Sequence, residues 1–301
     1  MKDYTKKQQD LMRQVDKIAK HNRQGSFKTK ERYYGAMQNF TKHLADNYGL
    51  QKVANISDKH LHSYVEEMKS KNLSASTIKT NLSAIRFFHD KFPKTRNILS
   101  SNERFDLEKR DFIGSDKSWL PDEYNRIKEH SERLGNDLVH DTVVLARNEG
   151  LRIHEALRID RATAVQAIKT GELEIKGKGG KIRSVPLTEE SKQLLTDRVA
   201  ETPHGAKLFV QEDEKTHLVI KRVQNFISRH QNNIVDESRS ELIKSGENIT
   251  DRITFHGLRH TYAQEQYQKF RDQGYTEYQS RLEVSRLLGH ERDDVTKIYI
   301  T

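Results

Sequence analysis

The sequence predicts a mainly α-helical protein with one small β-hairpin, and three observations carry this prediction. Apolar residues recur at steps of three and four in the first third of the chain, as one face of a helix requires. Residues 171–187 alternate as strands do, and helical spacing returns after them. A length of 301 residues suits two domains, since a domain averages roughly 150 residues.

The first third of the chain predicts an all-helical domain over residues 1–110. Its clearest helix covers residues 29–48, where one face holds six apolar or aromatic residues, Tyr33, Tyr34, Met37, Phe40, Leu44 and Tyr48. Two further helices follow serines that can act as N-caps. These are Ser57 for one helix, and Ser74 or Ser76 for the other.

A stretch of charged residues with weak periodicity predicts a linker over residues 111–117 and a second domain over residues 118–301. The second domain opens with helical patterns at residues 121–134 and 136–148. Gly150 follows the second pattern, as a glycine does when it ends a helix.

The only strand signal lies at residues 171–187, where alternation around Gly179 and Gly180 predicts a β-hairpin with a tight turn. Helical spacing then returns through Ile227 and again near Leu288. Residues 229–251 are polar and charged, and two interpretations stay open for them: an extended helix or a protruding insertion.

Composition excludes several classes of function. The chain has no cysteine, so it has no disulfide, no thiolate metal site and no thiol nucleophile. No apolar run approaches the roughly 20 residues of a membrane span, and the charged amino terminus does not resemble a secretory signal. We therefore expect a soluble, cytoplasmic protein with no membrane partner.

Positive charge is concentrated at one end of the chain. The net charge is +9, yet residues 1–110 hold 23 Lys and Arg against 12 Asp and Glu, while residues 111–301 hold 30 against 32. The basic excess therefore lies wholly in the first third. A solvated basic surface is one interpretation, and a module that binds nucleic-acid phosphates is the better one.

Two basic segments could contribute to a site. Arg152 follows a helix-ending glycine, and Glu155 lies three residues further on the same helix face, which also suits a simple ion pair. The predicted hairpin carries a run of cations, which often serves only to protect a strand edge: Lys176, Lys178, Lys181 and Arg183.

Histidines and a tyrosine form the remaining candidates. His256 and Arg259 share a helix face, so a base and a phosphate-binding cation could converge there. His256 and His260 have a spacing that zinc sites use, but Gly257 replaces the glutamate of a metalloprotease helix, and we expect no metal. His290 and Tyr299, taken singly, are equally typical of a packed core.

Taken together and in order, these segments resemble the signature of the tyrosine recombinases, the family of phage integrases and Xer recombinases. The matching segments are GLRIHE, GKGGK, HGLRH, LLGH and a tyrosine nine residues beyond the last histidine. They place the family's site on Arg152, Glu155, Lys178, His256, Arg259, His290 and Tyr299. The resemblance covers residues 118–301, and the first third resembles the family's SAM-like core-binding domain.

The resemblance implies that Tyr299 attacks a DNA phosphodiester. Arg152 and Arg259 would hold the non-bridging oxygens, because a guanidinium matches a phosphate in two-pronged geometry. His290 would add a third donor, and Glu155 would orient its neighbours.

Two proton transfers accompany that attack. A tyrosine has an ordinary pKa near 10, so a base such as His256 should remove its proton. Lys178 on the hairpin would protonate the departing 5′ oxygen. No metal and no cofactor are required.

The implied function is site-specific DNA recombination through a 3′-phosphotyrosyl intermediate, without ATP. The implied partners are double-stranded DNA, three further copies of the chain in a synaptic tetramer, and accessory DNA-bending proteins. Two alternatives stay open: a type IB topoisomerase, and a non-catalytic DNA-binding or architectural protein. The helical first third and the complete set of signature residues favour the recombinase.

Overall fold

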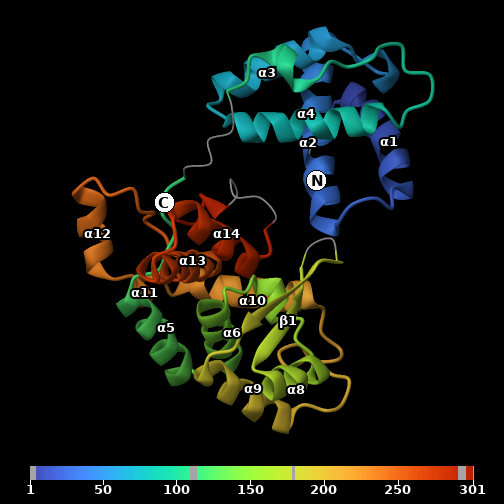
Figure 1. The fold of residues 1–301 in the computed structure, drawn as a ribbon. Coiled ribbons are helices and arrows are strands. Elements are labelled where there is room, and N and C mark those ends of the chain that lie inside the picture. The colour runs from blue at the N-terminus through green and yellow to red at the C-terminus, as the bar shows by residue number, and fades with distance from the viewer. Residues whose placement is uncertain (1–4, 109–113, 178–179, 291–295, 301) are drawn as a thin grey trace. The chain divides into compact units, whose positions relative to one another are not determined.

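The computed structural model describes residues 5–108, 114–177, 180–290 and 296–300. The chain forms two compact units, Met1–Asp111 and Phe112–Thr301 (Figure 1). Lys178, the proposed general acid, lies outside the described residues. Most of the described chain is helical, and its one sheet is a two-stranded hairpin, as the sequence predicts.

The amino-terminal unit is built only of helices within the described residues. They are α1 (Lys6–His21), α2 (Phe27–Tyr48), the 3-10 turn η1 (Val53–Asn55), α3 (Asp58–Ser70), α4 (Ala75–His89) and η2 (Asn102–Phe105). The predicted helices at residues 29–48 and after Ser57 and Ser74 are confirmed, and the Ser74 side chain accepts from Thr77 N. Helix α1 was not predicted.

One buried cluster holds this unit together. Leu11 of α1, Phe40 of α2, Leu61 of α3 and Leu82 of α4 are all fully buried in it. Burying a side chain of this size contributes roughly 1.5–3 kcal/mol. The apolar faces seen in the sequence therefore converge on a common core.

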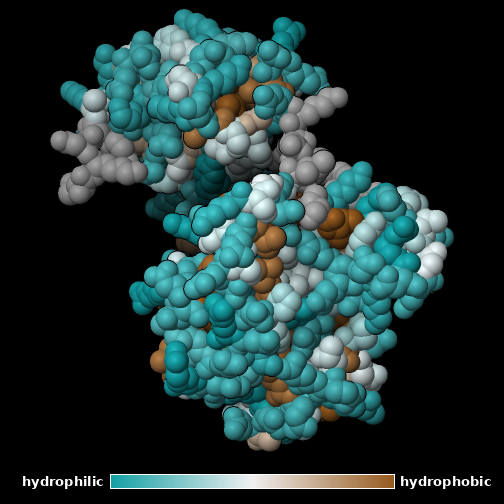
Figure 2. Space-filling view, turned by 90° about the vertical axis from the view of Figure 1, so that its left-hand side faces the viewer, coloured by the Kyte–Doolittle hydropathy of each residue, from teal (hydrophilic) through white to brown (hydrophobic). Residues whose placement is uncertain are grey.

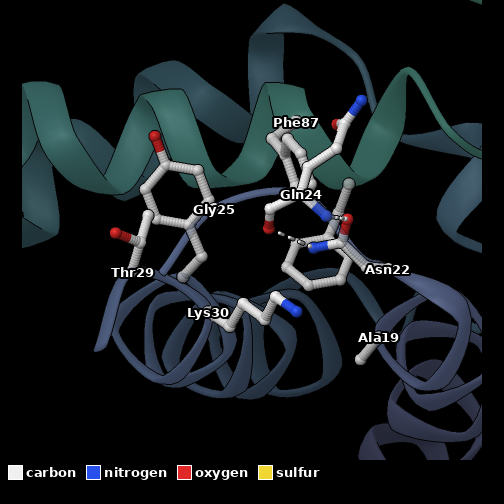
Figure 3. Close-up of a pocket in the computed structure, with 9 residues that line it drawn as sticks. Ala19, Asn22, Gln24, Gly25, Thr29, Lys30 and Phe87 are labelled. Atoms are coloured by element: carbon white, nitrogen blue, oxygen red, sulfur yellow. Dashed lines mark hydrogen bonds between the residues drawn. The ribbon is translucent and has the colours of Figure 1, made fainter. Parts of the chain in front are cut away.

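A small pocket lies beside the turn between α1 and α2 (Figure 3). The Asn22 side chain closes this turn by accepting from Gln24 N at 3.0 Å. Tyr33 and Phe87 contact edge to face, with ring centroids 5.5 Å apart, and form part of the wall. No candidate catalytic residue lines this pocket.

The second unit begins with α5 (Pro121–Arg133) and α6 (Asp137–Glu149), which match the two predicted helices. The short helix α7 (Ile153–Ala156) and α8 (Arg161–Thr170) follow, and then the hairpin of β1 (Glu172–Lys176) and β2 (Ile182–Pro186). The strands are antiparallel and pair Ile175 with Arg183. The predicted hairpin is therefore confirmed over its described residues.

Further helices follow the hairpin in the described part of this unit. They are α9 (Glu189–Glu201), α10 (Thr216–Arg229), α11 (Gln231–Ile234), α12 (Glu237–Lys244), α13 (Phe255–Asp272) and α14 (Glu277–Leu288). Helix α13 packs against both α6 and α14, while α8 covers the hairpin beside α9 (Figure 1). The candidate residues thus lie on elements that meet around α13.

The charged stretch at residues 229–251 does not extend one long helix. It forms α11 and α12, and α12 is fixed by the buried side chain of Arg239. Arg239 donates to both carboxylate oxygens of Glu123 at 2.6 Å and to the carbonyls of Ser118 and Thr250. This buried ion pair fastens α12 to the start of α5.

The visible surface is mostly hydrophilic, with hydrophobic residues in scattered patches (Figure 2). Within the described ranges, none of the helices combines the length and the apolar character that crossing a membrane demands.

Candidate active site

Glu155 lies at the centre of a cluster of arginines. Its carboxylate accepts from Arg152 N at 2.9 Å and from Arg152 Nη1 at 2.8 Å, which caps the start of α7. Arg183 of β2 donates to both carboxylate oxygens, at 3.0 and 2.8 Å. Arg259 Nη1 lies 3.9 Å from Oε2. One buried carboxylate thus orients three guanidinium groups.

Two helix ends position Arg259 from the other side. Its Nη1 donates to Gly150 O after α6, and its Nη2 donates to Leu288 O at the end of α14, both at 2.5 Å. These carbonyls lie where a helix dipole is negative, which suits a cation. Gly150 and Gly289 both have positive φ, and a Cβ on Gly289 would lie 2.9 Å from Arg183 Cδ. A larger residue at either position would be strained by the positive φ, and at Gly289 it would also crowd Arg183.

His290 links two of these arginines. Its Nε2 lies 3.1 Å from Arg152 Nη2 and 3.4 Å from Arg259 Nη2. The other ring nitrogen, Nδ1, is buried without a hydrogen-bond partner among the described residues. Both guanidinium groups therefore lie within hydrogen-bond distance of one nitrogen of His290, which accepts from them as a neutral imidazole.

Tyr299 lies against the same cluster and is 7% exposed. Its hydroxyl is 3.3 Å from His256 Nε2. The ring centroid is 4.5 Å from that of His260 and 5.2 Å from that of His290. The Arg259 guanidinium carbon lies 5.7 Å from the ring centroid. The phenol therefore lies between a base and a cation.

The histidines around Tyr299 are neutral at neutral pH. Burial, reinforced by the charges of Arg259 and Arg152, lowers the pKa of His256 to about 4 and that of His290 to about 3. Burial also lowers the pKa of His260 to about 3. A neutral His256 can accept a proton, which an imidazolium cannot.

The central ion cluster stays charged. Burial alone would raise the pKa of Glu155, but the hydrogen bonds and charge of Arg183, with further help from Arg152 and Arg259, lower it to about 2. Burial lowers the pKa of Arg259 to about 10, so this arginine remains protonated. At neutral pH the site therefore holds a carboxylate and three cations, an excess of positive charge.

The structure brings most of the predicted residues together. Arg152, Glu155, His256, Arg259, His290 and Tyr299 form one contiguous group. Sequence reasoning missed two neighbours. Arg183 was counted only among the hairpin cations, and His260 only as a possible zinc partner of His256. The i, i+4 spacing from His256 is a sequence signal for His260, whereas only the strand register places Arg183 against Glu155.

This arrangement can stabilise an anionic transition state beside a phenolic nucleophile. Two guanidinium groups meet at the His290 imidazole, and a neutral base lies 3.3 Å from the attacking oxygen. Donors that are fixed before the reaction lower its barrier, because they need no reorganisation. Attack of a tyrosine on a phosphate ester suits these groups.

Two family models match this chain, and several solved structures are similar to it. The model of the phage integrase family matches residues 118–301, and the model of the phage integrase N-terminal domain matches residues 8–96. The Tn1549 transposon integrase bound to transposon right end DNA is similar over 97% of this chain and 94% of its own, with TM-score 0.59 and 14% identity.

Two other solved structures are similar at comparable levels. A lambda integrase dimer on a COC′ core site has TM-score 0.62 and 17% identity, covering 97% of this chain and 95% of its own. The XerH recombinase bound to its palindromic difH substrate has TM-score 0.60 and 17% identity, covering 95% and 80%. At these identities, the likeness concerns the fold.

Proposed function

The chain belongs to the phage integrase family, and from this premise we propose that it is a site-specific recombinase that cuts and rejoins DNA through Tyr299. The family match covers residues 118–301 of the second unit. The function follows from the family and from the chemistry of the groups around the tyrosine.

One observation carries the proposal. The Tyr299 hydroxyl lies 3.3 Å from a histidine nitrogen that burial keeps unprotonated, and the Arg259 guanidinium adjoins the same ring. A tyrosine buried for packing alone would not need a neutral base at its hydroxyl and an adjacent surplus of cations.

The proposed reaction is an exchange of one phosphate ester for another. The Tyr299 oxygen forms a bond to the scissile phosphorus, its proton passes to His256, and the bond from phosphorus to the 5′ oxygen breaks. The products are a 3′-phosphotyrosyl link and a free 5′ hydroxyl. Arg152, Arg259 and His290 would stabilise the charge on the non-bridging oxygens.

We assign the remaining steps to Lys178 and to assembly on DNA. Lys178, which falls between β1 and β2 in the sequence, would donate a proton to the departing 5′ oxygen. Attack by a hydroxyl from another strand would reverse the first step and rejoin the DNA without ATP. Recombination would need four copies of the chain on two DNA sites in the cytoplasm, with accessory DNA-bending proteins.

Covalent capture tests this function. The protein is incubated with a library of nicked duplexes that trap the cleaved strand, and DNA that stays bound after denaturation is sequenced. We expect covalent adducts enriched in one sequence, and none with Tyr299→Phe. Adducts without enrichment, together with relaxation of supercoiled plasmid, would indicate a topoisomerase. An adduct that survives in Tyr299→Phe would refute the assignment.

A further inference from the structure

A segment before α5 crosses the start of α13, directly beside the residue proposed as the base. A Cβ built on Gly257 would lie 2.2 Å from Lys117 O and 2.7 Å from Trp119 Cδ1, so only a glycine permits this approach. Trp119 N donates to Thr261 Oγ1 and Trp119 Nε1 donates to Thr254 O, both at 2.8 Å. Lys117 is therefore adjacent to the helical turn that carries His256.

The backbone is fixed on both sides of Lys117. On one side, Asp116 N donates to Asn248 O at 2.6 Å, and the Asp116 side chain accepts from Gln264 at 2.9 Å. On the other side, Ser118 O accepts from the buried Arg239 at 2.7 Å. Arg239 of α12 thus helps to hold residues 116–118 in place, although α12 lies far from the reacting groups in sequence.

The Lys117 side chain is available to a ligand, because the residue is exposed and makes no ion pair or side-chain hydrogen bond with any described residue. Its charge acts on His256 and on His260, where it adds to the effect of burial in lowering the pKa of each ring. The pKa of His290 responds instead, after burial, to Arg259, Arg152 and Arg183.

We propose that Lys117 binds a DNA backbone phosphate next to the scissile one, on the His256 side of the site. An exposed ammonium on a fixed backbone suits such a phosphate, because lysine acts as a compact, hydrated point charge. The buried arginines suit the scissile phosphate, which must enter the site. This inference rests on the proposed function for the identity of the ligand.

Salt dependence tests the contact by binding alone. Each phosphate contact contributes about 0.9 to the slope of log affinity against log salt. We expect the slope of the full-length Lys117→Met variant to be shallower by about that amount, and Lys117→Arg to keep the wild-type slope. Lys169→Met is the matched control, since Lys169 on α8 is also exposed and pairs with no described residue. An unchanged slope in Lys117→Met would overturn the proposal.

A second measurement locates the phosphate. Duplexes carrying one uncharged methylphosphonate at successive positions beside the cleavage point are bound to wild type and to Lys117→Met. One neighbouring position should weaken wild-type binding and leave the variant unaffected. The assignment is wrong if the only methylphosphonate with this effect replaces the scissile phosphate itself. It is also wrong if no position weakens wild-type binding while leaving the variant unaffected.

Cleavage rates separate this contact from a role in the reaction. At saturating DNA, Lys117→Met should form the covalent adduct within a few-fold of the wild-type rate, while the DNA concentration at half-maximal rate rises. A lost rate with unchanged affinity would show that Lys117 acts on the chemistry and not on a neighbouring phosphate. Absence of any wild-type adduct would refute the recombinase function, while the salt slopes would still decide the fate of the Lys117 contact.

Discussion

At the scale of single residues, Glu155 determines how the cations of the site are arranged. It is 4% exposed and pairs directly with Arg152 and Arg183. Removing one partner of such a buried pair costs about 3–5 kcal/mol, because the other charge is left without compensation. The carboxylate contributes by orientation, since three cations around a phosphate site would otherwise repel each other.

Arg183 should be needed for cleavage although it was not among the expected catalytic residues. Arg183→Lys keeps the charge but cannot donate to both oxygens of Glu155, so Arg152 should lose its orientation. We expect a fall in the cleavage rate of about tenfold or more, toward the roughly 10²-fold effect of a misplaced catalytic group. DNA affinity should stay within a few-fold.

Single-turnover adduct formation at saturating DNA measures this effect. Arg158→Lys is the control, because Arg158 is exposed and donates no side-chain hydrogen bond to a described residue. Equal rates for Arg183→Lys and Arg158→Lys would show that Arg183 only supports the fold.

His260 should make stability depend on pH. Its pKa is about 3 in the folded protein and near 6.5 when unfolded, so the unfolded state binds the extra proton between these values. Stability should therefore fall as the pH drops below about 6.5. Glutamine binds no such proton. The free energy of unfolding of His260→Gln should therefore fall less than that of the wild type, by as much as about 1.4 kcal/mol for each pH unit.

Urea denaturation at pH values from 7 to 4 gives the free energy of unfolding of both proteins. The two curves should separate steadily as the pH is lowered. Parallel curves would mean that His260 can gain a proton without leaving its place against Tyr299.

At the scale of elements, periodic segments were predictable and long-range pairings were not. The helices at residues 29–48 and 121–134 carry their own apolar spacing, and the hairpin carries its own alternation. Helix α12 has no such signal. Its fully buried Arg239 is paired with Glu123, which lies 116 residues away in the chain. A local pattern cannot encode a partner at that separation.

The candidate site shows the same division. Motif spacing predicted the candidate residues at α7, on α13 and beyond α14, because the family signature fixes their positions in the sequence. It did not identify Arg183, since four cations on one hairpin look alike in sequence and only the strand register places Arg183 against Glu155. Lys117 went unnoticed because its contact with the turn of His256 depends on a glycine in another element.

The hairpin should supply the proton for the leaving group through Lys178. Sulfur in place of the 5′ bridging oxygen gives a leaving group of much lower pKa, which needs no general acid. Lys178→Ala should therefore cleave that substrate at nearly the wild-type rate while being slow on normal DNA. Arg152→Ala should stay slow on both, because the non-bridging oxygens are unchanged.

Cleavage rates on the paired substrates decide which lysine is the acid. Lys181→Ala serves as the comparison within the same hairpin. If the sulfur substrate restores cleavage by Lys181→Ala and not by Lys178→Ala, the general acid is Lys181.

At the scale of the whole molecule, charge and chemistry lie in different units. The described residues of the candidate site all belong to the unit Phe112–Thr301, while the net charge of residues 1–110 is +11 and that of the remainder is −2. A positive unit attracts DNA at long range, whereas the local surplus around Glu155 acts only on the phosphate that enters the site. Affinity and catalysis should therefore be separable.

The separation predicts how a fragment of residues 112–301 would behave. With ten net positive charges removed, since residues 1–111 hold 23 Lys and Arg against 13 Asp and Glu, it should bind DNA much more weakly than the full chain, and its log affinity should depend less steeply on log salt. Because the second unit has its own buried cores, the fragment should fold and still form some covalent adduct at low salt. Salt titrations of both proteins on one nicked duplex measure the two slopes, with circular dichroism as the control for folding. If a folded fragment has the same slope of log affinity against log salt as the full chain, the phosphate contacts lie in the catalytic unit. The basic excess of the first unit would then be only a solvated surface.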